Sequence, residues 1–96
     1  MEKGEINLVI IITINSLMRD GEYVKAYHEI HEINNLSNVE HIIATVESVI
    51  HNNMKYKNDD TILSDVFVSC SNEDYEREVI KHFSLNPING VRIDYI

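Results

Sequence analysis

The chain has 96 residues, and its 16 acidic and 8 basic side chains give a formal net charge of −8. Hydrophobic residues make up 44% of it and charged residues 25%, a globular composition that argues against disorder and fits a single domain over 1–96. The negative charge argues against direct binding to nucleic acid, which needs a basic surface, and against attraction to an anionic membrane. It serves solubility or favours a basic protein partner.

The N-terminal residues lack the positively charged start of a secretory signal peptide. The longest apolar run, 8–12, is far shorter than the ~20 residues that span a bilayer. The single cysteine, Cys70, rules out an internal disulfide. From these features we expect a cytoplasmic protein with no membrane association.

The first apolar segment, 5–19, fits two kinds of structure. Its many β-branched residues favour a strand, whereas its length and the four-residue spacing of its isoleucines favour a helix that is apolar around most of its girth. We interpret it as a central helix that is deeply buried or lines a dimer interface. Apolar residues at helical spacing predict a second helix over 22–33, which Asn34 and Asn35 end.

A third helix is predicted over 37–52, where Ser37 and Glu40 form a capping box. The segment 61–70 also carries apolar residues at helical spacing. We interpret it as a short helix, although its second half, 66–70, fits a strand as well.

A further helix is predicted to start at a cap formed by Ser71 and to end before Pro87. Apolar and polar residues then alternate over 91–95, which predicts a short strand. Together these elements predict a mostly α fold, a small bundle of four to five helices with a short C-terminal β-strand. The alternative is an α+β fold with a small sheet built from 66–70 and 91–95.

A histidine-rich stretch is superficially similar to the metal-binding helix of zinc proteases. Those helices place histidines four residues apart, whereas His28 and His31 are three apart. His28 and Glu32 are four apart and could share a metal ion. Further ligands, such as His41 or His51, would have to come from elsewhere. We therefore interpret the stretch as a polar helix face and expect no metal site and no cofactor.

No motif in the sequence fixes a reaction. A lone cysteine such as Cys70 is more often a small buried hydrophobe than a nucleophile. Paired acids near helix starts usually serve the helix dipole. We therefore expect that the protein is not an enzyme.

Two windows of the sequence contain acids but neither Lys nor Arg, 26–54 and 58–76. An acidic surface speeds association with a basic partner and helps to exclude wrong ones. An exposed tyrosine adds an aromatic anchor of the kind that interfaces favour. The predicted partner-binding residues are Glu29, Glu32, Glu40, Glu47, Asp59, Asp60, Asp65 and Tyr56.

Residues 14–27 place the end of the predicted hydrophobic helix before Gly-Glu-Tyr and then Ala. This junction resembles that of small bacterial toxin-immunity proteins, the cytoplasmic antidotes of contact-dependent and related polymorphic toxins. The resemblance implies a non-catalytic protein that binds and blocks a nuclease-type toxin. It transfers no binding residues, because such interfaces vary with the toxin.

The sequence therefore predicts a small acidic protein that inhibits a basic partner, as an immunity protein does. One alternative is a phage-type inhibitor of a nucleic-acid machine, such as an anti-CRISPR protein or a DNA mimic. Another is a helical regulatory adaptor that works as a homodimer. Convergence of the acids on one continuous patch favours inhibition, whereas scattered acids favour solubility alone.

Overall fold

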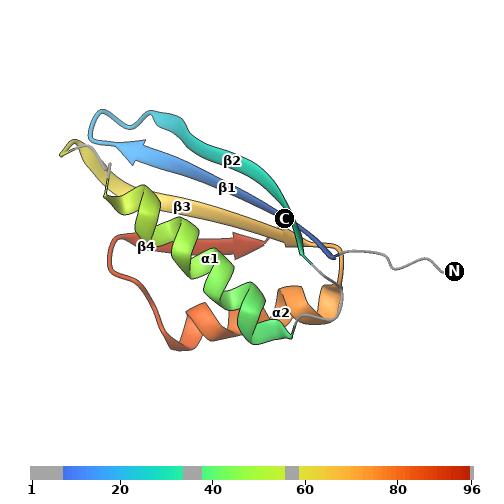
Figure 1. The fold of residues 1–96 in the computed structure, drawn as a ribbon. Coiled ribbons are helices and arrows are strands. Elements are labelled where there is room, and N and C mark those ends of the chain that lie inside the picture. Colours follow the sequence, from blue (N-terminus) through green and yellow to red (C-terminus); the bar gives the residue numbers. More distant parts are fainter. Residues whose placement is uncertain (1–7, 34–37, 56–58, 96) are drawn as a thin grey trace, which may run out of the picture.

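The computed structural model describes residues 8–33, 38–55 and 59–95. They form an α+β fold in which two helices lie against a four-stranded sheet (Figure 1). In chain order, the elements are β1 (Leu8–Met18), β2 (Tyr23–Ile33), α1 (Val39–Met54), β3 (Thr61–Cys70), α2 (Glu73–Leu85) and β4 (Val91–Tyr95). The predicted mostly α bundle of four to five helices is therefore wrong.

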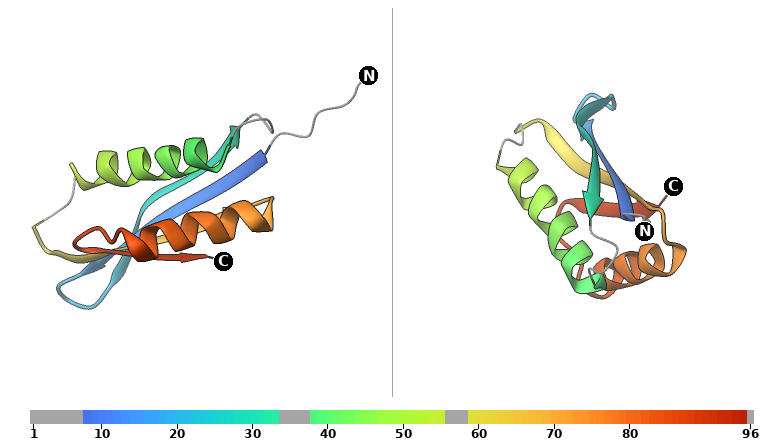
Figure 2. Two further views of the ribbon diagram at one scale, coloured as in Figure 1. Left: turned by 90° about the horizontal axis from the view of Figure 1, so that it is seen from below. Right: turned by 45° about the vertical axis from the view of Figure 1, so that its right-hand side comes forward.

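The strands are ordered β2-β1-β3-β4 across the sheet. β1 is antiparallel to both β2 and β3, whereas β3 and β4 are parallel and are connected through α2. The connection from β2 to β3 through α1 crosses β1. Both helices pack on the same face of the sheet, side by side (Figure 2).

The predicted helix over 5–19 is wrong in its described part, because β1 is the strand that lies between β2 and β3. Ile10, Ile12 and Ile14 are at most 1% exposed and face the helices. Side chains alternate between the two faces of a strand, so isoleucines four residues apart lie on the same face. The same spacing also places them on one face of a helix, and it therefore does not distinguish the two structures. The β-branched composition was the signal that decided the structure.

The predicted helix over 22–33 is also wrong, since β2 returns antiparallel to β1 through a tight turn. Gly21 has a positive φ of 93°, and the backbone N–H of Glu22 donates to Asp20 Oδ1 at 2.9 Å. Such a turn favours glycine and directs the chain into a hairpin. Ala26 is an extra residue in β2, because the register passes from Ile14–Tyr27 to Asn15–Lys25.

The helix predicted over 37–52 is confirmed as α1. Its first turn is capped by Asn38, whose side-chain oxygen accepts a hydrogen bond of 3.0 Å from the backbone N–H of His41. Ser37, the predicted cap, lies outside the described residues. Buried side chains at four-residue spacing, Ile42, Val46 and Ile50, direct one face of α1 towards the sheet.

The short helix predicted over 61–70 is wrong, because the whole segment is strand β3. Val66 and Val68 are fully buried between β1, β4 and the helices. The pairing that the alternative fold expected does occur, with Val66 opposite Ile93. It belongs to a larger sheet, since β1 and β2 continue it on the other side.

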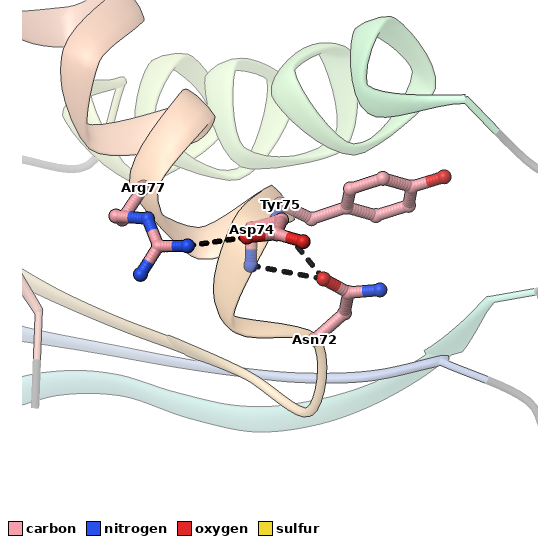
Figure 3. A network of polar contacts seen from close by, with 4 residues as sticks. All are labelled: Asn72, Asp74, Tyr75 and Arg77. Atoms are coloured by element: carbon pink, nitrogen blue, oxygen red, sulfur yellow. Dashed lines mark hydrogen bonds and ion pairs between the residues drawn. The ribbon is translucent and has the colours of Figure 1, made fainter.

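The last helix and strand were predicted from the sequence and are present as α2 and β4. The cap of α2 is Asn72 rather than Ser71. Its side-chain oxygen accepts from the N–H groups of Asp74 and Tyr75, and Asp74 also pairs with Arg77 (Figure 3). The Ser71 hydroxyl instead accepts a hydrogen bond from the backbone of β1.

The core lies between the helices and one face of the sheet, and it is almost entirely aliphatic. Its fully buried side chains are Ile10, Ile12, Ile14, Ile42, Ile50, Val46, Val66, Val68 and Val79. Within the described segments, no helix combines the length and the apolar character needed to cross a membrane.

Candidate functional site

The helices cover one face of the sheet, and no described element covers the other. Residues that lie directly opposite each other on paired strands point to the same face. We call the uncovered surface the open face. It comprises Val9, Ile11, Thr13, Asn15 and Leu17 of β1, Tyr23, Lys25, His28, Ile30 and Glu32 of β2, Leu63, Asp65, Phe67 and Ser69 of β3, and Arg92 and Asp94 of β4.

Apolar side chains make up much of the open face. Ile11 lies opposite Ile30, which is 60% exposed, and Leu17 lies opposite Tyr23, which is 55% exposed. Phe67 is half-buried on the neighbouring strand. A solvated sheet face normally alternates polar residues outward, so these side chains are unusual for a surface that only contacts water. Exposed apolar residues that adjoin one another mark interaction surfaces.

An ion pair on the open face joins β3 to the edge strand β4. Asp65 and Arg92 lie directly opposite each other on β3 and β4. Arg92 donates to both carboxylate oxygens, from Nε at 3.2 Å and from a terminal nitrogen at 2.7 Å. The Asp65 side chain is only 5% exposed, although it points to the open face. A bidentate contact of this kind holds both groups in one geometry.

A second carboxylate joins this pair. Asp94 lies 3.5 Å from Arg92 Nε. Its pKa is raised, first by desolvation and then by a hydrogen bond and charge repulsion from Asp65, while the charge of Arg92 opposes the rise. The pKa of Arg92 is itself raised, chiefly by its hydrogen bond to Asp65 and further by Tyr23. The open face therefore presents a permanent cation flanked by two acids.

The Asp65–Arg92–Asp94 cluster holds its charged groups in fixed positions on the surface. A proton held between two carboxyl groups can serve acid–base catalysis when a substrate cavity adjoins it. Asp65, Arg92 and Asp94 are not among the lining residues of the cavities beside the β1–β2 turn, between α2 and β4, beside α1 and α2, or between β2 and α1. Burial and charge pairing account for Asp65 without a reaction.

The predicted acids of β2 lie on opposite faces of the sheet. Glu32 is on the open face, whereas Glu29 is on the side of the helices, because residues an odd number apart along a strand point in opposite directions. Glu29 lines a groove of about 290 Å³ between β2 and α1, with Tyr27 and Val49 among its other walls.

The other predicted acids lie on further surfaces. Glu40 and Glu47 occupy the flank of α1 that also carries Ile43, and Ile43 adjoins α2. Asp59 and Asp60 lie at the start of β3, where Asp60 pairs with Arg19 at 3.6 Å. With Asp65 buried in its ion pair, the seven acids do not come together as one patch. Tyr56 lies outside the described residues.

A second polar cluster lies in the groove between β2 and α1. The Tyr27 hydroxyl donates to Glu29 Oε2 at 2.6 Å and lies 2.9 Å from His31 Nε2. The Tyr27 and His31 rings stack with centroids 6.5 Å apart. Burial, followed by the hydrogen bond and charge of Glu29, raises the pKa of Tyr27 to about 12. The phenol therefore stays protonated and orients its two neighbours.

The histidines considered as metal ligands are separated by the strand geometry. His28 points to the open face and His31 to the helix side. His28 and Glu32 share a face, but strand spacing places them ~13 Å apart, too far for one ion. Among the described residues, no group of three or more metal-ligating side chains is close enough to hold a metal ion.

Sequence reasoning selected Asp65 for its charge but missed its partners. Arg92 and Asp94 were recognised as the polar positions of a strand, which places both on one face. Their relation to Asp65 was hidden because 61–70 was interpreted as a helix. Comparisons with protein-family models, with curated proteins and with solved structures find no match for this chain.

Proposed function

We propose that this chain is a cytoplasmic, non-catalytic binding protein that inhibits a basic protein partner, and that it acts as an immunity protein against a nuclease-type toxin. One observation carries the proposal: the open face joins exposed apolar and aromatic side chains around the Asp65–Arg92–Asp94 cluster, with no described element over them. The resemblance of residues 14–27 to toxin-immunity proteins suggested this class of partner, although that junction begins with a helix and these residues form part of the β1–β2 hairpin.

The open face has the composition of an interface core. Tyrosine, phenylalanine and arginine are enriched at interfaces and carry much of their binding energy. Tyr23 on β2, Phe67 on β3 and Arg92 on β4 supply all three types on the open face. The ion pair holds Arg92 in place before binding, which lowers the entropy lost when a partner docks.

The net charge contributes to the proposed inhibition at longer range. A chain of formal charge −8 attracts a basic domain during diffusional encounter. The acids are separated over several surfaces, so the support that one continuous acidic patch would give to inhibition is absent, and the proposal rests on the open face. Imitation of a nucleic-acid backbone requires a continuous row of charges, which these acids do not form. The proposal of a DNA mimic therefore loses support relative to an immunity protein.

The test uses the purified chain and the purified product of the adjacent gene. Tyr23→Ala removes an exposed aromatic side chain of the open face, and Leu85→Ala removes a side chain that is 71% exposed at the end of α2. We expect the wild-type chain to bind the product and inhibit its nuclease activity. Tyr23→Ala should weaken binding roughly tenfold or more, and Leu85→Ala should leave it unchanged.

Salt dependence separates the contribution of charge from that of contact. We expect the association rate of the wild-type complex to fall as ionic strength rises, because salt screens long-range attraction. Lack of binding and of inhibition would contradict the proposal. An equal loss of binding affinity in Tyr23→Ala and Leu85→Ala would contradict the assignment of the open face as the contact surface.

A further inference from the structure

We propose that two copies of this chain pair through their β2 edges, antiparallel about a two-fold axis at Ile30, to form one continuous eight-stranded sheet. This inference does not rest on the proposed function, since it concerns the free protein. β2 is an edge strand of 11 residues. Most of its side chains are exposed, and Ile30 is 60% exposed. Such an edge is a template for pairing with another strand.

The hydrogen bonds of β1 show which groups of β2 point outward. The N–H of Val9 donates to Ser71 Oγ at 3.0 Å, and its C=O accepts from the N–H of Ser71 at 3.0 Å. Both groups of Val9 therefore point towards β3 and away from β2. In an antiparallel ladder, hydrogen-bonded and non-hydrogen-bonded pairs alternate. Val9 and Glu32 are thus a non-hydrogen-bonded pair.

The same alternation applies to every second pair, Ile11–Ile30 and Thr13–His28. The N–H and C=O groups of His28, Ile30 and Glu32 consequently point away from the sheet. In the described part of the chain, these groups have no backbone partner across the edge. They are spaced to form three pairs of hydrogen bonds with an antiparallel copy of the same residues.

The side chains of this segment are complementary to their own copy. In the proposed register, His28 lies opposite Glu32 of the partner subunit. Glu29 lies opposite His31 of the partner subunit, and Ile30 lies opposite its own copy. Every acid of the paired segment then lies opposite a histidine, and the symmetry makes each pair twice. Opposite partners stabilise adjacent strands, whereas like charges directly opposite destabilise them.

Neighbouring registers lose this complementarity. When the axis moves by one residue towards the N-terminus, Glu29 lies opposite its own copy. When it moves by one residue the other way, His31 lies opposite its own copy. The sequence of β2 therefore selects the axis at Ile30 among the registers that its outward backbone groups allow.

The monomer already holds several of these side chains in place. Thr13 Oγ1 lies 2.8 Å from His28 Nδ1, which leaves Nε2 as the ring nitrogen available to Glu32 of the partner subunit. On the helix side, the Tyr27 hydroxyl holds both Glu29 and His31. The pairing would cover Ile30, and it would join the two open faces into one surface.

Sedimentation of the full-length chain alone tests the pairing. We expect a monomer–dimer equilibrium in the wild-type protein. Glu32→His places two histidines opposite each other at both ends of the pairing, and His28→Glu places two acids there. Each single substitution should raise the dimer dissociation constant about tenfold. The double variant H28E/E32H exchanges the partners and should restore the wild-type constant.

A backbone variant and a crosslink provide independent readouts. Ile30→Pro removes an outward N–H that makes no bond within the monomer, and edge strands tolerate proline at such positions. It should abolish dimers while the circular dichroism spectrum remains native. With Cys70 replaced by alanine, Ile30→Cys should form a disulfide-linked dimer, since directly opposed residues have suitable Cα separations. Ile62→Cys, at a β3 position that is 54% exposed, is the matched control.

Two outcomes would overturn the pairing. The first is a wild-type protein that stays monomeric up to about 1 mM. The second is a dimer that the single substitutions leave unchanged, or that H28E/E32H fails to restore, since its interface would then lie elsewhere. Tyr23→Ala should leave the dimer intact, so failure of the pairing and failure of the proposed function are distinguishable.

Discussion

On one face of β1, Ile10, Ile12 and Ile14 are at most 1% exposed beneath the two helices. On the other face, Val9 and Ile11 are half-buried, and no described element lies over them. The two faces of this strand have similar side chains but different surroundings. A strand with branched apolar residues on both faces is typical of a sheet covered on both sides. The side chains of the open face are therefore of the kind that a second layer normally covers.

The sharpest test of this comparison shortens one isoleucine on each face. Ile12→Ala leaves a cavity in the aliphatic core, and we expect it to lower the free energy of unfolding by ~3 kcal/mol. Ile11→Ala should cost less than ~1.5 kcal/mol, because its site remains partly in contact with water. Urea denaturation of both variants measures the difference. Equal losses would mean that the open face is covered in solution.

A second test compares two carboxylates that each pair with an arginine. Asp65 is 5% exposed in its pair with Arg92, whereas Asp74 is 79% exposed in its pair with Arg77. Asp65→Asn should lower the free energy of unfolding by ~1–2 kcal/mol, because a buried bidentate contact is weakened. Part of that loss is offset, since Asp94 loses a neighbouring charge.

Asp74→Asn is the matched control for this pair. Exposed ion pairs contribute little, so its effect on the free energy of unfolding should stay below ~0.5 kcal/mol. Thermal and urea unfolding of the two variants provide the comparison. Similar effects from both would indicate that water reaches Asp65 more readily than its 5% exposure implies.

Asp94 gives the open face a pH dependence. Its pKa is raised in the folded state, so its contribution to stability is complete below the unfolded pKa of ~3.9 and is lost as pH rises through the folded pKa. Asp94→Asn cannot ionise and can still donate a hydrogen bond to Asp65. We expect it to raise the free energy of unfolding at neutral pH by ~0.5 kcal/mol, a small value because Asp94 is 46% exposed.

The pH profile distinguishes this effect from a general change in net charge. The advantage of Asp94→Asn over the wild-type protein should shrink as pH falls towards ~4, where the wild-type carboxyl is protonated. Asp59→Asn removes the same charge from an exposed position at the start of β3. An equal gain in the free energy of unfolding in both variants would contradict the explanation that Asp65 acts on Asp94. So would a gain that does not change with pH.

The difference between the two faces of the sheet also explains which helices and strands could be predicted from the sequence. α1 and α2 were predicted because each has one apolar face and a clear start. The apolar residues of each fit a helical period near 3.6 residues and do not fit the alternation of a strand. β1 was missed because both of its faces are apolar, which removes the alternation that identifies a strand. β2 was missed because Tyr23, Tyr27 and Ile30 lie at helical spacing and resemble a buried helical stripe, although Tyr23 and Ile30 are exposed.

The candidate site could be predicted only in part for the same reason. Asp65 was selected for its acidity, but its surroundings depend on β3 lying beside β4, which a helical interpretation of 61–70 excludes. The acids of 29–47 were grouped as one acidic surface on two predicted helices. In a strand followed by a helix they point in different directions. The positions of polar residues became interpretable only when the strand register was known.

The smallest predicted effect lies on the covered side of β2, where the environment of Tyr27 differs from that of the open face. Its pKa of about 12 exceeds the ordinary value of 10.0, so its stabilising contribution is present below pH 10 and is lost as pH rises through about 12. Tyr27→Phe removes the hydroxyl that holds Glu29 and His31, which should cost ~0.5 kcal/mol at neutral pH. In an absorbance titration, this variant should lack the tyrosine of highest pKa, whereas Tyr23→Phe should retain it. If both variants titrate alike, the groove between β2 and α1 does not shield Tyr27 from water.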